Sequence, residues 1–300
     1  MQIKSSILGL ASALSAYLIW GFSVIFFRQL KAVPPFEILM HRMIWSFALL
    51  IAMVLILKRR REFAQALKSF RTLRILLVST LLVGCNWGIF IWAINSDHIL
   101  DASLGYFICP LVSILLGSLI LHERLRLLQW AAVFLAAGAV VYLTVYVGTF
   151  PWVALLLAMT FGFYGLLRKT APVEALEGLT VETLLLCLPA TGYLLWLDRN
   201  GAGAFLRIDR STDLLLMGTA LVTAVPLLLF NIGARRLNLA TIGILQYIAP
   251  SCTFLLAVFF YHEPFASAQL YTFSAIWLAL ALYSCDAVRH IRRLQRIAPG

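Results

Sequence analysis

The sequence predicts an all-α membrane protein with ten transmembrane helices, arranged as two inverted five-helix repeats. The first observation is composition: apolar residues make up 62% of the 300 residues and charged residues only 12%, against roughly 25% charged in soluble domains. The second is that the apolar residues gather in ten runs, each near the roughly 20 residues that a helix needs to cross a bilayer. The third is that landmarks of one half of the chain return in the other half.

The ten runs are continuously apolar rather than alternating, which favours helices over the strands of a β-barrel. They cover residues 7–27, 36–57, 74–94, 102–121, 127–147, 150–167, 178–197, 213–233, 240–261 and 267–287. The longest connections, 58–73 and 198–212, are predicted to be surface loops. The first run is longer than the apolar segment of a signal peptide, so it is expected to remain as the first span.

The distribution of Lys and Arg predicts the orientation. With the N-terminus in the cytoplasm, the cytoplasmic segments hold eighteen basic residues, Arg168 and Lys169 among them, and the outer loops hold five. Basic residues gather in cytoplasmic loops of membrane proteins, so both termini are expected in the cytoplasm, the second in a basic tail over residues 289–300. These loops also explain the net charge of +11, and the expected partner is the lipid bilayer rather than nucleic acid.

The stretch 102–130 supplies the landmarks of the repeat. Each has a counterpart 140 residues later: Pro110 and Pro250, Ser113 and Thr253, His122-Glu123 and His262-Glu263, Gln129 and Gln269. Five spans in a repeat is an odd number, so the second copy must enter the membrane from the opposite side. The expected units are residues 1–147 and 148–288. Inverted repeats are characteristic of secondary transporters, whose substrate site lies near the midplane between the repeats.

The chain resembles the drug/metabolite transporter superfamily, and within it the RarD-type, chloramphenicol-sensitivity-associated group of EamA-like proteins. The residues that carry the likeness are 17–21, 37–46, 86–87 with 90–93, 102–111, 163–169, 173–175, 182–183 and 246–250. The resemblance implies ten helices, two EamA-type repeats, a bacterial inner-membrane location and transport of small organic molecules. One departure is that many members have a small residue, often glycine, where this chain has His122 and His262.

Two charged residues within the predicted spans are candidates for substrate binding. Arg42, beside His41 in the second span, is costly to insert, by roughly 2.5–3.5 kcal/mol, so it is expected to face a cavity or a partner. Its planar guanidinium suits a carboxylate; the alternative is that it pairs structurally or reaches the outer membrane interface. Glu182 lies 140 residues after Arg42, at the matching depth from the other face. It is a candidate proton-coupling carboxylate, a counter-ion for a substrate amine, or the partner of a basic residue.

Uncharged polar and aromatic residues within the spans complete the predicted pocket, because small-molecule sites have apolar walls and a few polar groups. They are Trp20, Asn86, Trp87, Tyr106, Asn231, Gln246 and Tyr247; the alternative is that they bond or pack between helices. Pro110, Pro226 and Pro250 are expected to kink their helices, with or without motion.

These observations predict a secondary transporter of small amphipathic or zwitterionic metabolites or drugs, amino-acid-like or chloramphenicol-like, coupled to protons or working by exchange. No phosphate-binding loop and no H-E-x-x-H motif occurs in the sequence, and the five cysteines lack C-x-x-C spacing. No cofactor or metal is therefore expected, and a ten-helix monomer is expected to suffice. The alternative from another class is an intramembrane enzyme acting on lipids or peptides, for which the sequence shows no catalytic set.

Overall fold

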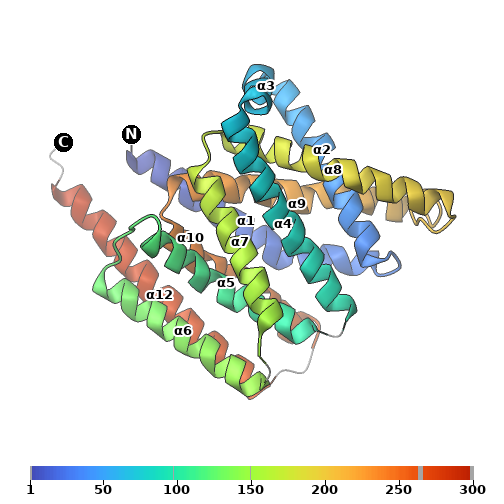
Figure 1. The fold of residues 1–300 in the computed structure, drawn as a ribbon. Coiled ribbons are helices and arrows are strands. Elements are labelled where there is room, and N and C mark those ends of the chain that lie inside the picture. The colour runs from blue at the N-terminus through green and yellow to red at the C-terminus, as the bar shows by residue number, and fades with distance from the viewer. Residues whose placement is uncertain (1, 97, 149, 263–265, 298–300) are drawn as a thin grey trace.

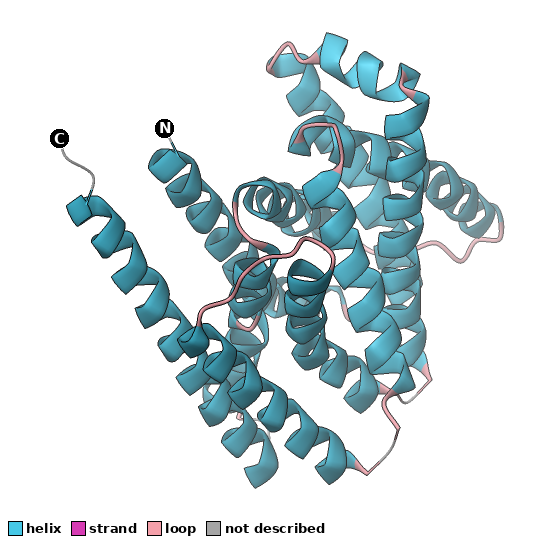
Figure 2. Ribbon diagram, turned by 60° about the vertical axis from the view of Figure 1, so that its left-hand side comes forward, coloured by secondary structure: helices cyan, strands magenta, loops and turns pink. Residues whose placement is uncertain are grey.

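The computed structural model describes residues 2–96, 98–148, 150–262 and 266–297, without the side chains of 2–4, 94–95, 99–102 and 290–297. In this part of the chain every regular element is a helix. Figure 1 shows the helices as one bundle, with the start of α1 and the end of α12 on the same side, and Figure 2 agrees. Glu263 and residues 298–300 of the predicted tail lie outside the described residues.

The helices follow the predicted spans closely. They are α1 (Gln2–Phe27), α2 (Pro35–Ile56), α3 (Arg60–Lys68), α4 (Phe70–Asn95), α5 (Ile99–Leu119), α6 (Leu127–Val147), α7 (Trp152–Thr170), α8 (Ala175–Arg199), α9 (Arg210–Arg236), α10 (Leu239–Gln246), α11 (Ile248–Leu255) and α12 (Ser267–Ile297), with a 3₁₀ turn at Arg28–Leu30 and a π turn at Leu256–Phe260. Among the described residues, nine helices are long and apolar enough to cross a membrane, and Ser103–Leu119 is a shorter apolar helix. The all-α class and the multi-pass membrane character are therefore confirmed.

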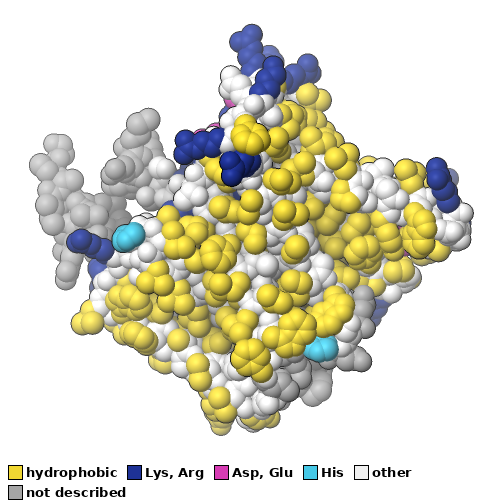
Figure 3. Space-filling model, in the orientation of Figure 1, with side chains coloured by type: hydrophobic (Ala, Val, Ile, Leu, Met, Phe, Trp, Pro, Cys, Tyr) yellow, Lys and Arg dark blue, Asp and Glu magenta, His cyan; other side chains and the backbone are white. Residues whose placement is uncertain are grey.

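The surface has the distribution expected of a bilayer protein. Large apolar side chains are exposed on α1, α4, α6, α7, α8 and α9, and Figure 3 shows hydrophobic side chains over most of one face. Lys and Arg gather at the top of that view, over α3. We call this side of the bundle, which also holds the start of α1 and the end of α12, the α3 end.

The prediction of a plain loop over 58–73 was wrong, because α3 occupies Arg60–Lys68. Its apolar side packs on the bundle: Ala66 is buried with Leu76 of α4 and Val181 of α8. The helix was missed because its sequence is polar and too short to cross a membrane. An apolar face beside basic residues is typical of helices that lie at a bilayer surface.

The predicted ninth span, counted above as one candidate span over Leu239–Phe260, is interrupted at Tyr247. α10 ends at Gln246 and α11 begins at Ile248, and Pro250 contributes to this break since it has no N–H to donate to the Gln246 carbonyl one turn earlier. Pro110 stands inside α5 and likewise leaves the Tyr106 carbonyl without its helical donor. α10 lies close to this point of α5: a Cβ on Gly243 would come within 2.7 Å of the Pro110 carbonyl oxygen.

The helix contacts fall into pairs that recur when the halves of the chain are exchanged. α1 packs on α9 as α7 packs on α4, α2 packs on α9 as α8 packs on α4, and α5 packs on α7 as α10 and α11 pack on α1. Three further contacts join matching helices directly: α2 with α8, α5 with α10, and α6 with α12. α6 and α12 run side by side along one edge of the bundle (Figures 1 and 2).

Local geometry also recurs at the 140-residue offset. His122 and His262 both have left-handed backbone angles, with φ of 54° and 51°. The Gln129 side chain accepts a hydrogen bond from the Arg126 N–H, and Gln269 accepts one from Ala266, each at 3.0 Å. Glycine adopts such an angle without steric cost, so the two histidines stand at positions whose backbone favours glycine.

Candidate functional site

Arg42 enters the interior of the bundle from α2. Its Nε donates a hydrogen bond to Thr223 Oγ1 on α9 at 2.9 Å, and its Cζ lies 5.2 Å from the ring centres of Phe27 and Trp87. The side chain is only partly buried. In the described part of the chain it makes no ion pair with a carboxylate, so its charge is balanced by aromatic faces and one hydroxyl.

Tyr106 lies on α5 and packs against α4. Its ring is 5.8 Å from that of Phe90, and 48% of its surface is exposed. Of the predicted site residues, Trp87 is the one whose ring lies beside the Arg42 guanidinium among the contacts of the described chain.

Asn86 lies one residue before Trp87 but is engaged by the neighbouring helix. Its amide donates to the Leu157 carbonyl and to Thr160 Oγ1 on α7, both at 2.9 Å. The side chain remains partly accessible, and its carbonyl oxygen is not used in these bonds. Asn86 thus ties α4 to α7 and positions Trp87 beside Arg42.

Five rings pack together in the interior of the bundle, and we call them the aromatic cluster: Tyr17, Trp20, Phe161, Tyr164 and Phe230. Trp20 lies 6.1 Å from Phe161 and 6.0 Å from Phe230, and Phe230 stacks on Tyr164 at 6.1 Å. The cluster belongs to a buried core on which Trp87 also packs. One side of the aromatic cluster therefore touches the surroundings of Arg42.

Glu182 is bound to the aromatic cluster through Tyr164. The Tyr164 hydroxyl donates to its Oε2 at 3.3 Å, and the Ser79 hydroxyl donates to its Oε1. Asn231 joins through its amide, which donates to the Tyr164 hydroxyl at 3.2 Å. Helices α4, α7, α8 and α9 thus contribute one side chain each to a network around a carboxylate that is 1% exposed.

The sequence placed Arg168 in a cytoplasmic loop, and this was wrong: it lies within α7 and is 0% exposed. Its Nε faces Glu182 Oε1 at 3.7 Å. The positive-inside count missed this residue because Lys169 follows it at the end of a span. Tyr164 and Arg168 are one helical turn apart and so share a face, which is the signal that could have joined both to Glu182.

The remaining predicted residues are more deeply packed. Gln246 donates to the Cys109 sulfur at 3.0 Å, Tyr247 donates to the Phe107 carbonyl at 3.1 Å, and both tie the α10–α11 break to α5. The Gln246 amide oxygen is buried without a hydrogen-bond partner in the described chain.

His41 lies on a different side of α2 from Arg42. The Trp45 indole donates to its Nδ1 at 3.3 Å, and its ring packs 5.0 Å from Phe205 in the loop before α9. Glu37, one turn earlier, accepts a 2.7 Å hydrogen bond from the Ala204 N–H in the same loop. The structure therefore groups His41 with the loop that connects α8 and α9 rather than with Arg42.

The α3 end is closed by charged side chains that bond to backbone groups. Glu123 accepts hydrogen bonds from the N–H groups of Leu239 and Ala240, at 2.7 and 3.0 Å. Lys169 lies 3.7 Å from Glu123 and also donates to the Leu237 carbonyl. Arg235 donates to the Ala171 carbonyl at 2.9 Å. These bonds join the ends of α5, α7 and α9 to the start of α10.

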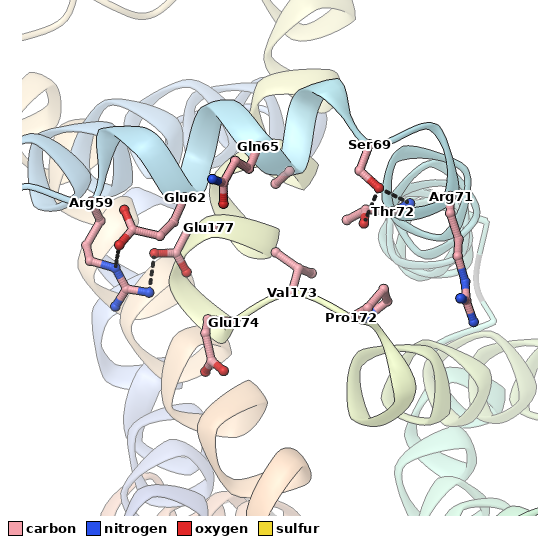
Figure 4. A pocket seen from close by; sticks show the side chains of 11 residues that line it. Arg59, Glu62, Gln65, Ser69, Arg71, Thr72, Pro172, Val173, Glu174 and Glu177 are labelled. Carbon is pink, nitrogen blue, oxygen red and sulfur yellow. Dashed lines mark hydrogen bonds and ion pairs between the residues drawn. The ribbon is translucent and has the colours of Figure 1, made fainter.

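A cavity of about 410 Å³ lies at the α3 end and includes none of the predicted site residues. It is bordered by α3, the start of α4 and the connection before α8 (Figure 4). Arg59 bridges Glu62 and Glu177 there, at 3.4 and 2.9 Å, so these three of the charges that line the cavity are paired with each other. A second cavity of about 340 Å³, between α1 and α9, is lined almost wholly by apolar side chains.

Comparisons with known proteins identify relatives over nearly the whole chain. The EamA-like transporter family profile matches residues 7–145. An uncharacterized transporter of Vibrio cholerae is 48% identical over 94% of this chain and 93% of its own. Protein RarD of Salmonella typhi is 45% identical over 96% of this chain and 98% of its own. A protein crystal structure has a similar fold, with a TM-score of 0.70 at 20% identity over 95% of this chain and 98% of that one. Among the described residues no group of three or more His, Cys, Asp or Glu could hold a metal ion.

Proposed function

Because this chain belongs to the EamA-like transporter family, we propose that it is a secondary transporter of small organic solutes that carry a carboxylate. The solutes are amphipathic or zwitterionic, of the size of amino acids or of drugs such as chloramphenicol. Transport proceeds by alternating access and is driven by proton coupling or by exchange. The substrate site includes Arg42, Trp20, Trp87, Tyr106 and Asn86.

The observation that carries this proposal is the state of Arg42. It is an intramembrane cation that reaches partly accessible space and has no carboxylate partner in the described chain. Burying an unpaired charge is costly, and a carboxylate on the solute removes that cost. The guanidinium keeps four N–H groups for this purpose, while Phe27 and Trp87 provide faces for an apolar body.

The recurring helix pairs and the matching geometry at His122 and His262 support an arrangement of two inverted repeats, residues 1–147 and 148–288. Exchanging the conformations of two such halves moves the opening from one side of the membrane to the other. The concentration of basic residues at the α3 end supports placing that end in the cytoplasm of a bacterial cell, with both termini there and the protein in the inner membrane. The functional unit is the monomer.

A thermal-shift screen of the purified protein against amino acids, their oxidised derivatives and chloramphenicol-like drugs tests this function, since a ligand of the native state raises the melting temperature. Carboxylate solutes are expected to stabilise the wild type and not Arg42→Ala. Arg199→Ala, which removes an exposed arginine at the end of α8, is the matched control and should respond like the wild type. Stabilisation of Arg42→Ala and wild type by the same solutes would contradict the role of Arg42.

A further inference from the structure

Arg168 is buried with most of its hydrogen-bonding capacity unused. A guanidinium has five N–H donors. Nη2 donates to the Ala175 carbonyl at 3.3 Å, while Nε and Nη1 have no hydrogen-bond partner in the described chain. The approach of Nε to Glu182, at 3.7 Å, is an ion pair without a hydrogen bond. Buried polar groups in native proteins are normally satisfied, so an exception calls for an explanation.

Glu182 does not depend on Arg168 for its hydrogen bonds. Ser79 and Tyr164 donate to its two oxygens, and both donors would stay in place if the arginine turned away. The two charges therefore attract one another across a loose contact, and the two side chains can separate without stripping the carboxylate of its donors. This arrangement is expected of an ion pair in which another carboxylate can take the place of Glu182 beside Arg168.

The backbone around Arg168 leaves room for its guanidinium. Gly178 of α8 faces it, and a Cβ at that position would collide with Nη1. Thr223, which accepts from Arg42, and Asn231, which donates to Tyr164 beside Glu182, are eight residues apart on α9, or roughly 12 Å along the helix. Lys169 and Glu123 close the α3 end. Arg168, which pairs with Glu182, is thus separated along the bundle from the proposed substrate site.

We propose that Arg168 is a second carboxylate-binding site, which Glu182 occupies in this conformation and which a small monocarboxylate occupies when Glu182 is absent or displaced. The proposal relies on the proposed transport function only for the identity of the natural ligand. Within that function, Arg42 and Arg168 would receive the carboxylate of the solute at two places separated along the bundle.

Chemical rescue tests the site with acetate as the probe. Glu182→Ala removes the resident carboxylate and vacates space that acetate can fill. The melting temperature of purified Glu182→Ala is expected to rise with sodium acetate beyond its response to sodium chloride at equal ionic strength. The double variant Arg168→Gln/Glu182→Ala has the same vacancy without the cation and should respond equally to both salts. The wild type, which has Glu182 in place, serves as the control for acetate binding at Arg42. The relevant quantity is the rise in melting temperature of Glu182→Ala in acetate beyond the rise seen with the wild type.

An equal response of the single and double variants, or no additional shift in the single variant, would overturn the proposal. If Glu182→Ala is unfolded in chloride, the same comparison is made during purification: folded protein in acetate but not in chloride supports the site, and failure in both salts contradicts it. The result is independent of the solute screen. If carboxylate solutes stabilise Arg42→Ala as much as the wild type, the proposed role of Arg42 in the transport function is refuted. The acetate response of Glu182→Ala would be unchanged by that result.

Discussion

Arg42 on α2 and Thr223 on α9 are joined by a 2.9 Å hydrogen bond across 181 residues of sequence. The bond fixes the guanidinium through Nε and is its one hydrogen bond in the described part of the chain. The other four N–H groups remain for a ligand. The two residues come from different halves of the protein. A solute bound to Arg42 would therefore contact a side chain whose position depends on both halves.

Thr223→Val should weaken carboxylate binding without abolishing it. The valine keeps the volume of threonine but cannot accept the hydrogen bond, and hydrogen bonds to charged groups contribute roughly 1.5–3 kcal/mol. We expect the dissociation constant of a solute found in the screen to rise roughly 10- to 150-fold, measured by calorimetric titration. Thr219→Val is the control, because the Thr219 hydroxyl bonds to the Leu216 carbonyl of its own helix. Unchanged affinity in Thr223→Val would show that the bond does not position Arg42.

Glu123→Ala should destabilise the protein by about 1–2 kcal/mol, the usual cost of losing a helix N-cap. The Glu123 carboxylate accepts from the first N–H groups of α10, which have no acceptor within the helix. Glu123→Gln keeps one acceptor oxygen and should cost less. Thermal unfolding measures both variants against Glu62→Ala, which removes a half-exposed carboxylate. Equal melting temperatures for Glu123→Ala and Glu62→Ala would contradict the capping role.

Replacement of His122 by glycine should preserve the stability of the protein, and replacement by valine should lower it. Its φ of 54° lies in the left-handed region, which costs a residue with a Cβ roughly 1–2 kcal/mol and a β-branched residue more. His122→Gly is expected to melt at or above the temperature of the wild type, and His122→Val below it. The same ordering is expected at His262, where φ is 51°. A higher melting temperature for His122→Val than for His122→Gly would argue against the left-handed angle.

Asp209 should make stability depend on pH at the start of α9. Its carboxylate accepts a 2.7 Å hydrogen bond from the Thr212 N–H, and this bond lowers the pKa of Asp209 below its usual 3.8. The ionised form therefore stabilises the folded state above the unfolded pKa, and the contribution is lost as pH falls through the folded value. The difference in melting temperature between wild type and Asp209→Asn should be constant near neutral pH and shrink below about pH 4. If the difference in melting temperature between wild type and Asp209→Asn grows as the pH falls, the ionised carboxylate does not stabilise the start of α9.

The positions of the long helices could be predicted because a chain inside a bilayer must satisfy its backbone internally, so a long apolar run has little choice but a helix. The exceptions are local. α3 has neither the length nor the apolar composition of a span, and its place depends on packing against Leu76 and Val181. The break at Tyr247 depends on more than its proline, since Pro110 is accommodated inside a continuous α5.

The candidate site was only partly accessible from the sequence. Arg42 and Glu182 are recognisable because charges are rare within spans. The partner of Glu182 was not, because an arginine next to a lysine at the end of a span is normally a topology signal. Which side of α2 carries His41 and which carries Arg42 also depends on the neighbouring helices, and the sequence does not contain that information in a readable form.

The aromatic cluster has an electrical consequence. A layer of packed rings holds little water and has a low dielectric constant, so much of the voltage across the membrane falls over a layer of this kind. Moving one elementary charge through 100 mV changes its free energy by about 2.3 kcal/mol. A carboxylate that passes from Arg42 to Arg168 would cross this layer, and the voltage would then favour one direction of net charge movement. On the proposed mechanism, the voltage dependence of solute uptake would therefore report whether net charge crosses the aromatic cluster.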